Sequence, residues 1–222
     1  MIKIALIDNG ITQPVNLYAK KRFVVSNRDM NMHATYCFLI MQKYVAENVQ
    51  IIDLKVLNGD AGNPMKIISA MKWCLRKKVD IISISCGTQD MNYYKIFDKW
   101  TQRLIKNKVI IISAMSNTGG KSLPASLDNV IAVKARADLN AGEFIYSINR
   151  SGKFFFAGGA VYEITLPNGR KVLTSCCNSF ATPMITGLIS KYLANNQSVD
   201  MSLLCEWLDK QAGNLWSDNK KV

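Results

Sequence analysis

The side chains best suited to chemistry are one histidine and three short polar segments. His33 is the only histidine among the 222 residues, and imidazole is the side chain that most readily transfers a proton near neutral pH. Each polar segment follows an apolar run: Asp8-Asn9-Gly10, Ser85-Cys86-Gly87 and Ser116-Asn117-Thr118-Gly119. An acid, small polar side chains and a carboxamide are more typical of a hydrolytic site than of a packing surface. A lone histidine is more often structural, so its role depends on these neighbours.

Short β-branched runs alternate with helical patterns over the first two thirds of the chain. Continuously apolar runs are typical of strands buried on both faces of a parallel sheet, and apolar residues three and four apart predict helices. The predicted strands are residues 2–7, 50–57, 79–86, 108–114 and 129–135, and the predicted helices are residues 33–47, 65–78, 93–106 and 180–194. This alternation predicts an α/β fold with a doubly wound, mostly parallel sheet and helices on both faces.

The rest of the chain adds smaller elements to this sheet. Gly-containing turns such as Asn168-Gly169 predict a small antiparallel hairpin near residues 144–174. Residues 198–222 predict one amphipathic helix followed by a polar end. Because no linker, repeat or low-complexity segment interrupts the chain, we expect a single domain over residues 1–222. Ligands bind at the carboxyl ends of parallel strands, so the three polar segments should meet at one edge.

Composition excludes several classes of protein. The apolar fraction of 49% is too high for a disordered chain, and the formal net charge is +12. The six cysteines form no C-x-x-C pair, and one histidine leaves no second imidazole for a Cys/His zinc site. We therefore expect reduced thiols, no metal and no cofactor. The sequence has neither a signal-peptide pattern nor a membrane-spanning apolar run, which predicts a cytoplasmic protein without membrane contact.

Three motifs resemble those of subtilisin-like serine proteases. Ala5-Leu6-Ile7-Asp8-Asn9-Gly10 resembles the aspartate motif V-I-D-T-G, and His33-Ala34-Thr35 resembles the histidine motif H-G-T-H. Asn178-Ser179-Phe180-Ala181-Thr182-Pro183 resembles the nucleophile motif G-T-S-M-A-S-P, with Gly187 at a family glycine. The three motifs follow the order Asp, His, Ser, which is the subtilisin order. The resemblance implies the subtilisin-like α/β fold.

Further segments extend this resemblance over about residues 1–195. In sequence order they are Lys55-Val56-Leu57 for K-V-L, Ile84-Ser85-Cys86-Gly87 for M-S-L-G, Ser113-Ala114-Met115-Ser116-Asn117-Thr118-Gly119 for A-A-A-G-N-E-G, and Pro124-Ala125 followed by Asn129-Val130-Ile131-Ala132-Val133 for Y-P-A…V-I-A-V.

The resemblance implies a role for each site residue. Asp8, His33 and Ser179 would form a catalytic triad, in which the histidine activates the serine and the aspartate orients the histidine. Asn117 would donate a hydrogen bond to the oxyanion, a contact that contributes about 3–4 kcal/mol. The backbone N–H of Ser179 would be the second donor. The implied walls of the S1 pocket are Ser85, Cys86 and Gly87 on one side and Ala114, Met115 and Ser116 on the other.

Each of these residues also has a plainer interpretation. Asp8 can be a loop carboxylate, Ser179 a helix N-cap and Asn117 a turn former. Their occurrence in the family order together with the only histidine favours the triad.

Several positions depart from the family pattern. Ala34 replaces a glycine and Tyr36 a second histidine, Cys177-Asn178 replaces Gly-Thr, and Met115-Ser116 replaces Ala-Gly. Because Met115 and Ser116 are bulkier than the family residues, we expect a narrower pocket and a restricted substrate set. Asp8 lies near the first residue, so the family's preceding segment, with part of a calcium site, is expected to be missing, as is a propeptide.

Together these features predict a serine endopeptidase, specifically an intracellular processing protease such as one that removes a leader peptide. The alternative is an inactive subtilisin-like peptide-binding module or a subunit whose partner completes the N-terminal region. The basic charge, including Lys20-Lys21-Arg22 and Lys77-Lys78, predicts steering of an acidic peptide substrate, or else a solvated surface kept for solubility. Nucleic acid is not an expected partner, because the sequence contains no recognition motif.

Overall fold

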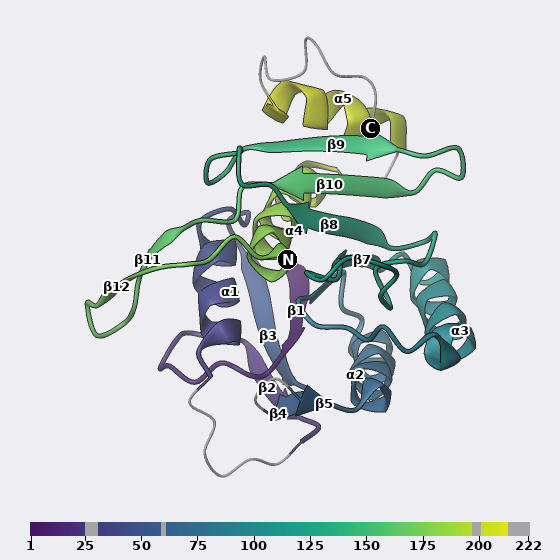
Figure 1. Ribbon diagram of the computed structural model, residues 1–222, viewed down its shortest axis with the longest axis horizontal. Helices are drawn as coiled ribbons and strands as arrows, with labels where there is room; N and C mark the ends of the chain where they lie inside the picture. Colours follow the sequence, from purple (N-terminus) through teal and green to yellow (C-terminus); the bar gives the residue numbers. More distant parts are fainter. Residues whose placement is uncertain (25–30, 59–60, 197–200, 213–222) are drawn as a thin grey trace.

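An eight-stranded, mostly parallel sheet forms the centre of the protein (Figure 1). The computed structural model describes residues 1–24, 31–58, 61–196 and 201–212. The sheet strands are β1 (Ile2–Asp8), β2 (Ala19–Arg22), β3 (Val49–Lys55), β6 (Ile81–Ile84), β7 (Ile110–Ala114), β8 (Ile131–Ala135), β9 (Phe144–Ile148) and β10 (Phe154–Gly158). Their spatial order is β2-β3-β1-β6-β7-β8-β10-β9. Every neighbouring pair is parallel except β9 with β10. The predicted fold class is therefore confirmed.

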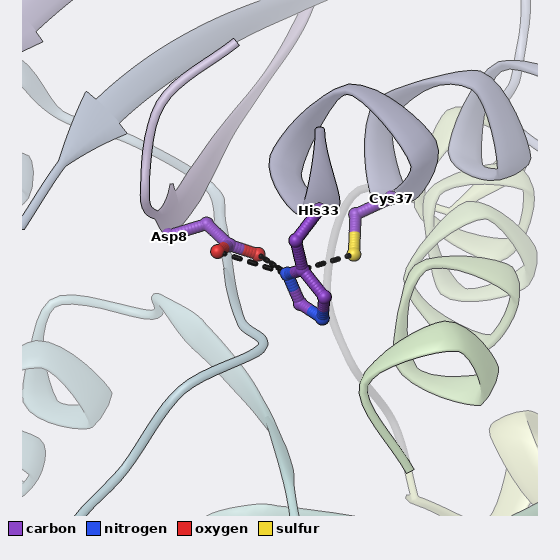
Figure 2. Close-up of side chains that lie close together, drawn as sticks. All are labelled: Asp8, His33 and Cys37. Carbon is purple, nitrogen blue, oxygen red and sulfur yellow. Dashed lines mark hydrogen bonds and ion pairs between the residues drawn. The ribbon is translucent and has the colours of Figure 1, made fainter. Parts of the chain in front are cut away.

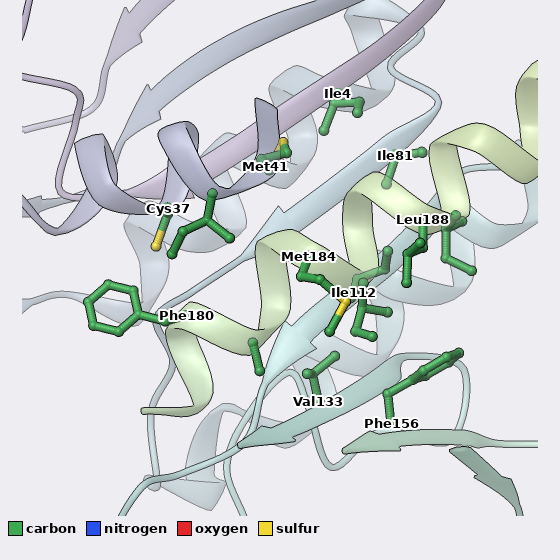
Figure 3. Packing of buried hydrophobic residues seen from close by; sticks show 14 of the residues in the cluster. Ile4, Cys37, Met41, Ile81, Ile112, Val133, Phe156, Phe180, Met184 and Leu188 are labelled. Carbon is green, nitrogen blue, oxygen red and sulfur yellow. The ribbon is translucent and has the colours of Figure 1, made fainter. Parts of the chain in front are cut away.

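Helices cover both faces of this sheet. The main helices are α1 (His33–Gln42), α2 (Pro64–Lys77), α3 (Tyr94–Lys106) and α4 (Asn178–Asn195). Alternate strand residues point to opposite faces, so Ile4 and Leu6 belong to the core beneath α1 and α4, whereas Ala5 and Ile7 belong to the core beneath α2 and α3. Figure 3 shows the first core, where Met184 of α4 lies beside Ile112 of the sheet.

Short elements complete the described chain. They are the pair β4 (Leu57–Asn58) and β5 (Ala61–Gly62), the 3₁₀ turn η1 (Met91–Tyr93), the pair β11 (Glu163–Thr165) and β12 (Lys171–Leu173), and the helix α5 (Met201–Ala212). The region predicted as one hairpin contains two antiparallel pairs, β9–β10 and β11–β12. The amphipathic helix predicted in the tail corresponds to α5, and the predicted polar end lies outside the described residues. None of the helices in the described ranges is long and apolar enough to span a bilayer.

The first helix ends earlier than its sequence pattern predicts. The predicted helix covers residues 33–47, whereas α1 ends at Gln42. The reason is tertiary: α4 passes close to the chain at Tyr44, where a Cβ on Gly187 would lie 2.6 Å from the Tyr44 Cβ. The N–H of Ala46 then donates to Ser190 Oγ at 3.1 Å rather than to a helical carbonyl. Glycine at position 187 therefore allows the two segments to pack closely.

The basic run at residues 20–22 forms the edge strand β2, which the sequence did not predict as a strand. Arg22 donates to Oδ2 of the fully buried Asp53 at 2.7 Å, and the N–H of Ile11 donates to the same oxygen at 3.0 Å. Arg22 therefore neutralises a buried carboxylate that also holds the segment after β1. Lys20 and Lys21 are exposed, so they are the residues of this run whose charge faces solvent.

Candidate active site

Three elements bring the predicted triad residues together. Asp8 is the last residue of β1, His33 the first of α1 and Ser179 the second of α4. His33 Nδ1 lies 2.9 Å from Asp8 Oδ2 and 3.0 Å from Oδ1, and His33 Nε2 lies 2.8 Å from Ser179 Oγ. Figure 2 shows the imidazole directed at the carboxylate. One ring nitrogen of His33 thus faces the serine hydroxyl and the other faces a carboxylate. This is the arrangement in which an oriented base activates a serine nucleophile.

The start of α1, and with it His33, is held by side chains from outside the helix. The N-cap residue Met32 provides no side-chain hydrogen bond. Instead, the N–H of His33 donates to Asn31 Oδ1 at 2.9 Å and the N–H of Ala34 donates to Asn9 Oδ1 at 3.0 Å. These bonds satisfy N–H groups that a helix leaves unpaired at its start. Since Asn9 follows Asp8 directly, the acid and the histidine are positioned by one segment.

The charge state of the imidazole depends on the carboxylate beside it. Burial disfavours the charged imidazole and lowers the pKa of His33, but Cys37 and Asp8 favour it, and the net effect is a pKa above 6.5. Burial also raises the pKa of the Cys37 thiol, so this thiol is neutral near pH 7. The Asp8 carboxylate is therefore the charge that stabilises protonated His33.

Cys37 lies one helical turn after His33, beside the histidine side chain (Figure 2). Its Sγ lies 3.9 Å from His33 Nδ1 (Figure 2). The thiol also donates to the Ser179 carbonyl oxygen at 3.4 Å. Asp8, His33 and Cys37 present three atoms within 4.8 Å of one another that can ligate a metal. A cation on Nδ1 would displace the Asp8–His33 hydrogen bond, so a metal and the triad geometry exclude each other here. That the site functions without a metal stays a prediction.

The amide of Asn117 is oriented by a bond to the start of α4. Its Oδ1 accepts from the N–H of Asn178 at 2.9 Å. With its oxygen engaged in this way, Asn117 has its Nδ2 group left to donate. Asn117 and Ser179 line the same cleft, as an oxyanion site requires.

This cleft has a volume of about 690 Å³ and lies at the carboxyl ends of β1, β6 and β7. The predicted S1 residues all line it: Ser85, Cys86, Gly87, Ala114, Met115 and Ser116. Asp8, His33, Cys86 and Cys177 are the described lining residues with ionisable side chains, and none of the described lining residues is a lysine or an arginine. In the described parts of the chain, the Lys and Arg side chains therefore lie outside the cleft lining.

One glutamine joins the two predicted S1 walls. Gln89 Nε2 donates to the Gly119 carbonyl at 2.8 Å, to Ser116 Oγ at 3.0 Å and to Thr118 Oγ1 at 3.3 Å. A Cβ on Gly87 would lie only 2.6 Å from the Leu123 carbonyl oxygen, so the backbone at Gly87 packs directly against Leu123 and leaves no space for a side chain. Gln89 therefore links the segment after Gly87 to the loop that contains Ser116, and the narrow pocket expected from Met115 and Ser116 stays a prediction.

Sequence reasoning did not assign roles to Asn9, Gln89 or Asn178. Each lies next to a predicted motif: Asn9 follows Asp8, Asn178 precedes Ser179 and Gln89 lies two residues after Gly87. Their position next to a motif was the one signal that the sequence offered. It does not reveal their roles, because the hydrogen bonds of these residues join segments that are distant in sequence.

The sheet order, the helix arrangement and the Asp-His-Ser contacts define a subtilisin-like protein. A family model described as the subtilase family, Peptidase_S8, matches residues 1–212. The chain belongs to this family.

Two curated relatives match over part of their length. The major intracellular serine protease of Bacillus subtilis (strain 168) is 28% identical over 156 residues, which are 66% of this chain and 47% of the relative. An intracellular serine protease of Paenibacillus polymyxa is 29% identical over 162 residues, or 68% of this chain and 48% of the relative. The chain thus spans about half the length of these relatives.

Solved structures share the fold. A lanthipeptide protease matches with a TM-score of 0.67 and 20% identity, over 90% of this chain and 76% of the other. The prenylagaramide maturation protease PagA matches with 0.66 and 21%, over 89% and 78%. A cold-adapted subtilisin-like serine proteinase matches with 0.66 and 20%, over 88% and 76%. At these identities the similarity concerns the fold.

Proposed function

We propose that this protein is a serine endopeptidase whose triad is Asp8, His33 and Ser179. The observation that carries the proposal is the pair of contacts from one imidazole, 2.8 Å to Ser179 Oγ and 2.9 Å to Asp8 Oδ2. The curated relatives, both named as intracellular serine proteases, support the same activity and a location inside the cell.

The reaction follows from this geometry. His33 Nε2 accepts the Ser179 hydroxyl proton while Oγ attacks the carbonyl carbon of the scissile peptide. The oxyanion accepts hydrogen bonds from Asn117 Nδ2 and from the Ser179 N–H in the first turn of α4. His33 then gives the proton to the leaving amine as the C–N bond breaks. Water hydrolyses the acyl-enzyme by the same proton route, which restores the serine.

The substrate we propose is a specific peptide, such as a leader segment of a precursor. The bulk of Met115 and Ser116 and the Gln89 bonds that fix the Ser116 loop support restricted specificity. Structural neighbours include an epidermin leader peptide processing serine protease and the nisin leader peptidase NisP. Because no lysine or arginine among the described residues lines the cleft, a preference for acidic substrates would come from the surrounding Lys and Arg through long-range attraction.

A fluorophosphonate probe tests the activity, because it reacts only with an activated serine. We expect covalent labelling at Ser179 that is lost in Ser179→Ala. Ser69→Ala is the matched control: Ser69 is a hydroxyl on α2 that donates to the Met65 carbonyl, away from the cleft, and its loss should leave labelling intact. Absent labelling of the wild type, or equal labelling of Ser179→Ala, would contradict the protease and favour an inactive peptide-binding module.

A further inference from the structure

Asn178 is buried, with only 6% of the residue exposed, and both polar atoms of its side chain form hydrogen bonds. Its Nδ2 donates to the carbonyl oxygens of Met115 and Ser116, each at 3.0 Å. Its Oδ1 accepts from the N–H of Ala135 at 2.8 Å. Its backbone N–H donates to Asn117 Oδ1 at 2.9 Å.

These four bonds join three parts of the molecule. Met115, Ser116 and Asn117 follow β7, Ala135 ends β8, and Asn178 itself begins α4 directly before Ser179. One residue therefore sets the distance between the nucleophile, the candidate oxyanion donor and one wall of S1.

Only a carboxamide can make this set of side-chain bonds, since it offers two N–H donors and a separate acceptor oxygen. The threonine that the nucleophile motif G-T-S-M-A-S-P has at this position carries a single hydroxyl. Asn178 is thus a feature of this chain. Rotating its amide would break all three side-chain bonds in a buried site, where unpaired polar groups are costly.

We propose that Asn178 is a positioning residue for the oxyanion site, which holds Asn117 and the Met115-Ser116 wall at a fixed offset from Ser179. The proposal rests on the function proposed above. Asn178 acts through Asn117, because its own side-chain donors are occupied by protein carbonyls. The exposed Gln89 side chain donates to the same loop at Ser116, Thr118 and Gly119. These three bonds do not involve Asn117.

A double-mutant cycle separates this role from a general structural one. Asn178→Asp keeps the shape and the acceptor for Ala135 but removes both donors. We expect kcat to fall about 10- to 100-fold, since small misplacements at a reacting centre have effects of this size, while KM changes by less than a factor of about 3. Asn117→Ala should lower kcat by about 10²- to 10³-fold, the range known for subtilisin. Adding Asn178→Asp to Asn117→Ala should then cost little more.

The cycle has clear contrary outcomes. Equal losses from Asn178→Asp with and without Asn117, or a loss confined to KM, would overturn the proposal. Asn178→Thr, which introduces the family residue, should recover part of the lost kcat. Asn168→Asp is the matched control: this exposed asparagine in the β11–β12 turn accepts from the N–H of Arg170, and its change should leave kcat unaltered.

A measurement without turnover makes the proposal independent of the activity. The side-chain amide resonance of Asn117 can be assigned by its loss in Asn117→Asp. It should shift or broaden in Asn178→Asp and stay in place in Asn168→Asp, with the remaining spectrum preserved. An unmoved Asn117 resonance in Asn178→Asp overturns the positioning role even if Ser179 is an active nucleophile. A shifted resonance in a protein that does not hydrolyse peptides contradicts the proposed function alone.

Discussion

The two helix layers of this protein differ in how they are held and in what they carry. Helices α2 and α3 have eight Lys and Arg residues between them, whereas α1 and α4 have only Lys191. Local side chains cap the first layer: Asn63 accepts from Met65 N–H at the start of α2, and Asp90 accepts from Asn92 N–H in the turn that leads into α3. Neither α1 nor α4 has a side-chain cap from its N-cap residue.

This difference in capping means that the proposed chemistry depends on tertiary contacts at the starts of α1 and α4. Both helices that carry triad residues begin at polar partners from other segments, Asn9 for α1 and Asn117 for α4. The start of a helix favours developing negative charge, and Ser179 lies in the first turn of α4. The layer of α2 and α3 is amphipathic and solvated on its outer side, as a supporting layer is expected to be.

The largest expected difference between the layers comes from Asp8→Asn. We expect kcat to fall about 10⁴-fold, because the amide no longer stabilises the protonated imidazole or the required tautomer. Asp8 raises the pKa of His33, so the acid limb of kcat/KM should lie above pH 6.5 in the wild type and move to lower pH in the variant. Asp98→Asn on α3 should change neither quantity. A loss below about tenfold for Asp8→Asn would contradict the triad.

A smaller effect should separate the two kinds of helix start. Asn9→Ala removes the acceptor for Ala34 N–H and should lower the free energy of unfolding by about 1–2 kcal/mol and reduce kcat as well. Asp90→Ala should lower stability by about 1 kcal/mol but leave kcat intact. Urea denaturation and steady-state kinetics measure the two quantities. If both variants reduced kcat equally, the result would contradict a specific role of the α1 start in positioning His33.

The smallest effect concerns the cations of the outer layer. If they steer an acidic substrate, kcat/KM for a peptide with an acidic flank should exceed that for a neutral one by up to about 10-fold at low salt. The advantage should vanish between about 0.01 M and about 1 M salt, over which the Debye length falls from about 30 Å to about 3 Å. Lys95→Glu with Lys99→Glu, both on the exposed side of α3, should reduce it. A preference independent of salt and of these charges would assign the surface to solubility instead.

Much of the fold could be predicted from the sequence because the strands are long apolar runs. The predicted strands at residues 2–7 and 108–114 correspond to β1 and β7, since their period and composition allow little else. The extent of α1 could not be predicted, because its end depends on Gly187 and Ser190 of α4. Edge strand β2 was missed because Ala19–Arg22 is mostly charged, and its pairing with β3 is supported by the buried Asp53.

The sequence by itself determined the family, the order of Asp8, His33 and Ser179, and the alternation of strands and helices that brings them to one edge. Motif chemistry and hydrophobic period are local properties, and a sequence displays them directly. Only the tertiary structure decided which amides hold these residues. Asn9 and Asn178 make hydrogen bonds to partners in other segments, and these bonds form only when the segments pack together. The same asparagines in an unfolded chain would be ordinary turn formers.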